Sequence, residues 1–316
     1  MKPLRYAVRH IASSDRAGES RALALNRAGA AAGWQSGPTN GSSCAAMWAG
    51  GAFHDLGTLG GDSSIALGVN DSGLVVGWSE SMQGPARAFL WSDGVMRELD
   101  LPRHRSSVAA ALNDQGDIAG WLQHDDAAAT VAFLYQRDRF TSLGTLGGRE
   151  SRAHSISDAG VIVGEAEVDA RQSHAFVHRD GRMVDLGTLG GFRSAARCVA
   201  GLTWIAGHSQ TRDGEEHAFV ARDGQLADLG TLGGPHSYAY GVNQSGWVVG
   251  RSYGRDSTQS RAFLYVRGEM LDLNACVDPR AGWHLAEAWQ INDRGQIAGF
   301  GVHEGAIRAC VLEIDD

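Results

Sequence analysis

The sequence has no apolar run long enough to span a membrane as a helix, and it has no excess of positive charge. Lys and Arg total 28 against 36 Asp and Glu, which gives a net charge of −8. A net negative chain is repelled by nucleic acid and by anionic membrane surfaces, so we expect neither as a partner. The N-terminal MKPLRYAVRH has no apolar core and no small-residue cleavage site. We therefore expect a cytoplasmic protein, or a secreted one if a signal peptide has been removed.

Familiar motifs of metal binding and catalysis are also missing. The four cysteines (Cys44, Cys198, Cys276 and Cys310) form no C-x-x-C pair and do not have zinc-ligand spacing. The sequence contains no G-x-S-x-G, no H-E-x-x-H and no P-loop motif. We expect buried free thiols, no metal and no cofactor.

Glycine is abundant, at 43 residues, and much of it belongs to a repeated phrase. The phrase is HDLGTLGG at 54–61, TSLGTLGG at 141–148, VDLGTLGG at 184–191 and ADLGTLGG at 227–234. A phosphate-binding loop is needed once, within one strand–loop–helix unit. Four copies at near-constant spacing indicate architecture, so function should lie in what differs between the copies.

Each phrase ends a longer unit that carries a fixed Ala, an Asn-led turn, a Gly after two apolar residues, and Ala-Phe. Its second-strand glycines are Gly33, Gly77, Gly120, Gly164, Gly207, Gly250 and Gly299. Consecutive glycines are 43 or 44 residues apart, except for the last two, which are 49 apart. A period of 40–45 residues is typical of the four-stranded blades of β-propellers.

Turn residues divide each unit into four strands, which we name A to D in chain order. Turns such as NDSG at 70–73 suit the A–B connection, and DG at 93–94 suits the C–D connection. We predict a single all-β domain over 1–316, a seven-bladed β-propeller with four antiparallel strands per blade. The last unit lacks strand D, so we expect the N-terminal RYAVRHI strand to complete the last blade and close the ring. The predicted blades are 22–60, 66–101, 109–146, 153–189, 196–232, 239–273, and 288–314 with 5–11.

The units resemble the HAF-repeat family, named for a His-Ala-Phe triplet. HAF occurs at 174–176 and 217–219, and RAF occurs at 87–89 and 261–263. The resemblance covers nearly the whole chain, and it implies probable extracellular repeats with no shared activity. Because Arg replaces the histidine in other copies, we interpret His174 and His217 as scaffold.

Three positions in each unit should flank the axial mouth on the face with the long B–C loops and D–A crossovers. They are the residue after the strand A alanine, the residue before it, and the residue after the strand B glycine. The first three units place tryptophan and mostly aliphatic residues there, and the last four place mainly polar and aromatic residues. An apolar wall that faces convergent polar groups is typical of a small-molecule site.

The polar residues suit cofactor-independent acid–base chemistry of a lyase, cyclase or isomerase. Histidine transfers protons near neutral pH, arginine clamps a carboxylate, and tyrosine donates to an oxyanion. The candidate catalytic residues are His154, His208, Glu165, Tyr240 and Arg197. The candidate substrate-binding residues are Trp34, Trp78, Trp121, Arg152, Tyr238, Arg251, Trp289, Glu287 and Phe300.

Each of these residues also has a structural interpretation: tryptophans fill wedges between blades, and charged residues form an ion network. The leading hypothesis is a monomer that binds a small, natural-product-like molecule at the axial mouth, with acid–base catalysis. The alternatives are a protein or peptide interaction scaffold and a carbohydrate-binding module that stacks sugars on tryptophan. The extra residues near 274–287 are either a lid over the mouth or a neutral insertion.

Overall fold

The computed structural model describes residues 4–11, 18–39, 41–82, 84–125, 129–255 and 259–315, and within them nearly all regular structure is β-strand. Two short 3-10 helices, η1 (Leu273–Ala275) and η2 (Pro279–Ala281), follow β25. The strands are β1 (Tyr6–His10), β2 (Ser20–Leu25), β3 (Ala31–Ser36), β4 (Ser43–Ala49), β5 (Ala52–Gly57), β6 (Gly60–Val69), β7 (Val75–Ser81), β8 (Gly84–Ser92), β9 (Val95–Glu98), β10 (Ser106–Leu112), β11 (Ile118–Gln123), β12 (Thr130–Gln136), β13 (Arg139–Gly144), β14 (Ser151–Ile156), β15 (Ile162–Glu167), β16 (Ser173–Arg179), β17 (Arg182–Asp185), β18 (Gly190–Ala200), β19 (Trp204–Thr211), β20 (Glu216–Arg222), β21 (Gln225–Asp228), β22 (Gly233–Val242), β23 (Val248–Gly254), β24 (Ser260–Val266), β25 (Glu269–Asp272), β26 (Trp283–Ile291), β27 (Ile297–His303) and β28 (Ala306–Ile314).

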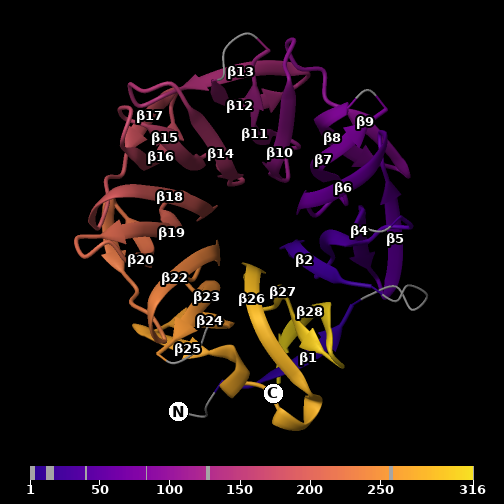
Figure 1. Ribbon diagram of the computed structural model, residues 1–316, viewed down its shortest axis with the longest axis vertical. Helices are drawn as coiled ribbons and strands as arrows, with labels where there is room; N and C mark the ends of the chain where they lie inside the picture. The colour runs from indigo at the N-terminus through magenta and orange to yellow at the C-terminus, as the bar shows by residue number, and fades with distance from the viewer. Residues whose placement is uncertain are drawn as a thin grey trace.

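The strands form antiparallel sheets arranged in a ring, with strand A of each sequence repeat nearest the axis (Figure 1). The prediction of seven separate blades is wrong. Five sheets stand alone with four strands each, and β14–β21 form one eight-stranded sheet. A single parallel bridge between Ser173 of β16 and Arg193 of β18 joins them, whereas β6 and β22 begin equally early, at Gly60 and Gly233, and their sheets stay separate. The fourth and fifth repeats therefore share one hydrogen-bonded sheet.

Strand β1 is the outer strand of the sheet β1-β28-β27-β26. It pairs antiparallel with β28 from Tyr6↔Ile314 to His10↔Cys310. The prediction that this strand closes the ring is also wrong, because β1 lies at the outer edge of the last sheet. The first and last sheets meet through a buried cluster that includes Ala22, Trp48, Ala298 and Val311. The backbone N–H of Ala309 also donates to Ser20 Oγ across this contact, at 3.0 Å.

The Ala-Phe landmark of the repeats is the core of each sheet-to-sheet contact. The phenylalanine side chains are completely buried between neighbouring repeats at Phe89, Phe133, Phe176, Phe219 and Phe263. Each such ring buries on the order of 150–250 Å², and these five are among the largest fully buried side chains of the described residues.

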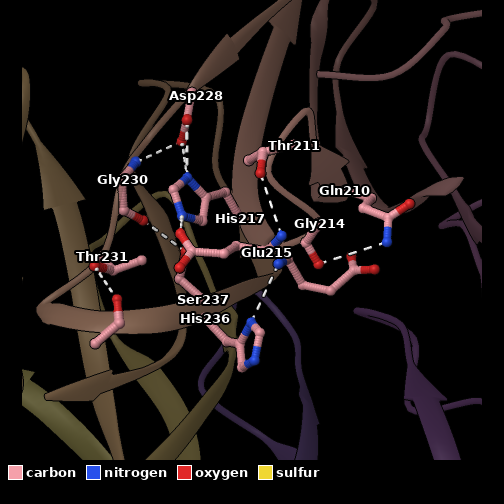
Figure 2. Close-up of polar contacts among 12 residues, drawn as sticks. Gln210, Thr211, Gly214, Glu215, His217, Asp228, Gly230, Thr231, His236 and Ser237 are labelled. Carbon is pink, nitrogen blue, oxygen red and sulfur yellow. Dashed lines mark hydrogen bonds and ion pairs between the residues drawn. The ribbon is translucent and has the colours of Figure 1, made fainter. Parts of the chain in front are cut away.

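The repeated Gly-rich phrase is a hydrogen-bonded crossover from strand D to the next strand A, as Figure 2 shows for residues near 228–237. Asp228 accepts from Gly230 N–H at 2.7 Å and lies 2.8 Å from Nδ1 of His217. Ser237 Oγ donates to the Gly230 carbonyl at 2.6 Å and accepts from Ala218 N–H at 2.8 Å. Gly230 has a φ of 69°, which a side chain would strain. The phrase therefore joins neighbouring repeats through hydrogen bonds within the scaffold.

The same crossover explains why His and Arg alternate in the HAF triplet. His174 lies 2.8 Å from Asp185, just as His217 lies against Asp228. In the sixth repeat Arg261 takes this place and pairs with Asp272 at 3.1 Å. The position needs a hydrogen-bond donor facing a strand D carboxylate, so both residues serve the scaffold.

A belt of asparagines lies at the A–B turns, on the other side of the disk from the crossovers. Each side-chain amide donates to the backbone carbonyl of the equivalent residue in the next repeat, as in Asn26 to Asn70 at 3.0 Å and Asn292 to Asn26 at 3.1 Å. Arg27 bridges this end of the axis by contacting Asp71, Asp114 and Asp158. Polar side chains therefore narrow the axial channel here.

The extra residues between the sixth and seventh strand B glycines lie on the outer rim, and not over the mouth (Figure 1). Tyr6 N–H of β1 donates to the Cys276 carbonyl at 2.9 Å, and Tyr6 also bridges to Val277. The Asn274 side chain holds both backbone groups of Leu285, at 2.7 and 3.0 Å. This segment anchors β1, so the interpretation of 274–287 as a lid is wrong.

Candidate functional site

Every strand A contains a β-bulge, and it falls directly after the fixed alanine. In β14, for example, Ala153 pairs with Gly164 and Ser155 pairs with Val163, which leaves His154 without a partner in the ladder. A bulge bends the strand and redirects the extra side chain. The bulged residues are Leu23, Leu67, Ala110, His154, Arg197, Tyr240 and Trp289. They are the residues of the first register singled out in the sequence.

The strand B glycines permit this geometry. A Cβ on Gly164 would lie 1.9 Å from the Arg152 carbonyl oxygen, and one on Gly207 would lie 2.0 Å from that of Ala195. No side chain can occupy such a position unless the two strands separate. The glycine is thus constant because strands A and B approach closely beside the bulge.

An axial cavity of about 520 Å³ is lined by residues from all seven repeats. Its volume falls in the range typical of sites for drug-sized molecules. Leu23, Leu67 and Val108 contribute to an aliphatic side of the wall. The predicted site residues in the lining are Trp78, Trp121, Arg152, His154, Glu165, Arg197, Tyr240 and Trp289.

His154 is at the centre of the polar side of the cavity. Its Nε2 lies 3.4 Å from Glu165 Oε1 and 3.2 Å from an Arg197 guanidinium nitrogen. Burial and the Arg197 charge lower the pKa of His154 to about 4, although Glu165 acts in the opposite direction. Burial raises the pKa of Glu165, but the hydrogen bond and charge of His154 and the charges of Arg197 and Arg152 outweigh it and lower that pKa to about 2. At pH 7 the pair is therefore an uncharged imidazole beside a carboxylate. The site does not keep the pKa of His154 near 7.

A second polar group continues around the axis from Tyr240. Arg251 pairs with Glu287 at 2.7 Å, and Trp289 Nε1–H donates to the other oxygen of that carboxylate at 2.8 Å. The Tyr240 ring stacks on Trp289 with centroids 4.5 Å apart and planes 12° apart. Burial and Glu287 raise the pKa of the Tyr240 hydroxyl, so it stays protonated. This group fixes the two aromatic rings that face the cavity.

His208 and Tyr238 lie beside this network and do not line the cavity. Their ring centroids are 5.1 Å apart, and Arg251 lies 4.8 Å from the Tyr238 ring centre. His208 Nδ1 is buried and, among the described residues, has no hydrogen-bond partner. Burial and Arg197 lower the pKa of His208 to about 4. His208, which the sequence predicts to be catalytic, therefore lies one layer behind the cavity wall.

Trp34 and Phe300 do not reach the cavity, contrary to the substrate-binding prediction. Arg21 lies between their rings, 5.4 Å from the Trp34 centroid and 4.5 Å from the Phe300 centroid. Phe300 is only 5% exposed. These three residues form a packed contact between the first and last repeats. Trp34 and Phe300 therefore have a packing role between repeats, as the alternative interpretation from the sequence proposed.

Glu150 is a residue of the site that was not predicted from the sequence. Arg152 pairs with Glu150 at 3.0 Å, more closely than with Glu165 at 3.8 Å. Glu150 precedes β14 in the crossover, where no register was assigned. Its spacing of two residues from Arg152 places both on the same side of an extended chain, and this is the signal that could have identified it.

Among the described residues, no group of three or more His, Cys, Asp or Glu side chains is placed to hold a metal ion. The four cysteines are buried, and Cys198, Cys276 and Cys310 are free thiols. Nor does the part of the chain that the structure describes include a helix with the length and hydropathy of a membrane span.

The ring of sheets and its axial cavity define a β-propeller. The fold resembles the propeller domain of the Trilobed protease from Pyrococcus furiosus, with a TM-score of 0.62 and 8% identity over 94% of this chain and 96% of that one. It also resembles a Mycobacterium tuberculosis puromycin-hydrolysing peptidase, with a TM-score of 0.60, 15% identity and 93% of this chain covered. The chain spans about half of that peptidase, at 51%.

A Pyrococcus horikoshii acylaminoacyl peptidase is similar as well, with a TM-score of 0.56 and 8% identity over 93% of this chain and 52% of that one. At such identities the likeness supports the fold alone. No protein-family model matches the chain, and no curated protein matches it in sequence.

Proposed function

We propose that this β-propeller binds a small organic molecule in its axial cavity, and that His154 accepts a proton there. The observation that carries the proposal is the asymmetric set of bulged residues. All seven bulges project toward one axis, yet only the fourth to seventh repeats place polar or aromatic side chains on them. A ring held by packing alone has no need of this difference, whereas a binding site does.

The geometry supports His154 as a proton acceptor and not as a donor. A pKa of about 4 keeps its imidazole neutral at pH 7, with a ring nitrogen able to take a proton. The Glu165 carboxylate, 3.4 Å away, would stabilise the imidazolium that forms. Tyr240, which keeps its proton, would be the hydrogen-bond donor to the developing negative charge. His208, behind the wall, is assigned to positioning.

A cavity-filling substitution tests the binding function. Ala110 is the bulged residue of β10 and lines the cavity, whereas Ala52 on β5 is exposed at the outer edge. Wild type, Ala110→Trp and Ala52→Trp are incubated with a mixture of cell metabolites, desalted, and analysed by native mass spectrometry. We expect a compound that the wild type and Ala52→Trp retain and that Ala110→Trp loses, with circular dichroism unchanged.

The same compound then tests catalysis. With His154→Gln we expect retention of the compound and loss of its conversion, because the amide keeps the size of the side chain and accepts no proton. Equal retention by wild type and Ala110→Trp contradicts the binding proposal and favours an interaction scaffold. The HAF-repeat resemblance, the monomeric state and the cytoplasmic location all remain predictions.

A further inference from the structure

Arg197 differs from the other arginines of the site in its partners. Arg152 pairs with Glu150, and Arg251 pairs with Glu287. Arg197, on the bulge of β18, has no carboxylate oxygen within 4 Å among the described residues. Its guanidinium contacts the neutral imidazole of His154, at 3.2 and 3.5 Å, and interacts with the Glu165 carboxylate at longer range. A cation in a partly buried cavity without a carboxylate partner is costly, and an anionic ligand offsets that cost.

The charges around the cavity limit the charge of the ligand. The lining contains Arg152, Arg197 and Glu165 as its charged side chains, and His154 is neutral at pH 7. Glu150, just outside the lining, pairs with Arg152, so these four charged side chains sum to zero and Arg197 is the arginine without a carboxylate oxygen within 4 Å in the described part of the chain. Glu165 lies on the His154 side of the site, and its carboxylate would repel a second negative charge on the ligand. This favours a monoanion over a phosphate dianion.

The rest of the wall selects the body of the ligand. Trp78 and Trp121 line the cavity with Leu67 and Val108. Leu67 is on β6, which lies across the ring from the β18 strand of Arg197, and Val108 is on β10, between β6 and β14 in the ring (Figure 1). Flat indole surfaces and aliphatic side chains favour a planar, apolar group. The planar fork of the guanidinium matches a carboxylate and can bind it through two hydrogen bonds.

We propose that the axial cavity is specific for monocarboxylic acids with a planar apolar body, and that Arg197 binds the carboxylate. The inference rests on the proposed function and names its ligand class. Binding would also change the protonation of the site. The Arg197 charge is one of the two main causes that hold the pKa of His154 low, so its neutralisation by a carboxylate would favour proton uptake by the imidazole.

Matched pairs of acids and amides test the inference. Benzoate, cinnamate and 1-naphthoate are titrated beside benzamide, cinnamamide and 1-naphthamide, with phenyl phosphate as the dianion. Binding is measured by isothermal titration calorimetry and by quenching of tryptophan fluorescence, since Trp78 and Trp121 line the cavity. The variants are Arg197→Met and Arg197→Lys, with Arg182→Met on the exposed face of β17 as the matched control.

We expect at least one acid to bind more tightly than its amide, and Arg197→Met to weaken that acid roughly 10- to 100-fold, as expected for a lost charge-assisted hydrogen bond. Arg182→Met should leave it unchanged, and Arg197→Lys should be intermediate. At pH 5.5, titration in two buffers of different ionisation enthalpy should show proton uptake in the wild type that His154→Gln abolishes.

Four results overturn the inference. Amides that bind as tightly as acids, or an Arg197→Met variant that binds the acids normally, remove the carboxylate requirement and leave the cavity as a small-molecule site. If phenyl phosphate binds more tightly than the carboxylic acids, the ligand class is a dianion and not the proposed monoanion. If no compound binds and Ala110→Trp also retains whatever metabolites the wild type retains, the inference and the proposed function fail together. Circular dichroism and thermal unfolding of each variant establish that it is folded.

Discussion

His154 makes the stability of this propeller sensitive to mild acid. In the folded chain burial and Arg197 lower its pKa from 6.5 to about 4. An unfolded chain binds a proton at this residue near pH 6.5, whereas the folded chain does not until about pH 4. Between these values the unfolded state binds more protons, so the free energy of unfolding falls as the pH falls. The stabilisation is complete above pH 6.5 and is lost progressively down to pH 4.

The magnitude follows from the size of the shift. Each pKa unit corresponds to about 1.4 kcal/mol, so His154 should cost the fold about 2 to 3 kcal/mol between pH 7.5 and 4.5. That is a large part of the 5–15 kcal/mol that is typical of a folded domain. His208, whose pKa is lowered by its own burial and by the same arginine, adds to the loss in the same pH window. The two effects are not additive, because a protonated His154 also lowers the pKa of His208.

Urea unfolding followed by circular dichroism at pH 7.5, 6.5, 5.5 and 4.5 measures this effect. We expect His154→Gln to flatten the dependence of unfolding free energy on pH relative to the wild type, since glutamine has no proton to gain in this range. His54→Gln, on the exposed edge strand β5, is the control and should keep the slope of the wild type. A His154→Gln slope equal to that of the wild type would refute the argument that burial beside Arg197 keeps the imidazole neutral.

Two further predictions concern the scaffold. Ser237→Ala should lower the free energy of unfolding by roughly 1–3 kcal/mol in urea titration, because it leaves Ala218 N–H and the Gly230 carbonyl buried without their partner; an unchanged midpoint would show that these groups find other partners. Gly164→Ala should disturb the cavity although it does not line it, because its Cβ would lie 1.9 Å from the Arg152 carbonyl. We expect a fall of several degrees in melting temperature together with loss of ligand retention in native mass spectrometry, and normal values of both would contradict the close approach of β14 and β15.

Much of the fold can be predicted from the repeat itself. The strand B glycines, the Asn-led turns and the Ala-Phe pairs give the period, and the structure places four strands in each period, counting β1 with the last. What the repeat could not predict is the hydrogen bonding between neighbouring units. One bridge between Ser173 and Arg193 merges two units into a single sheet, and it depends on where the backbone of β18 runs, not on residue identity.

The candidate site shows the same division. The residues directly after the strand A alanine line one cavity, and they include His154, Arg197, Tyr240 and Trp289. The register after the strand B glycine was less reliable. Trp78, Trp121 and Glu165 line the cavity, but Phe300 is buried against Arg21. Side chains of equal register point in the same direction at their strand, yet their length and neighbours decide whether they reach the axis.

The sequence by itself determined the unit that is repeated, its strands and turns, and the positions at which the copies differ, because strand periodicity and backbone sterics are local properties. Only the tertiary structure decided which of those positions share a cavity, that Arg197 has no carboxylate beside it, and that His154 is neutral. These properties depend on distances between residues about 43 positions apart and on the water excluded between them, and neither is set until the ring has formed.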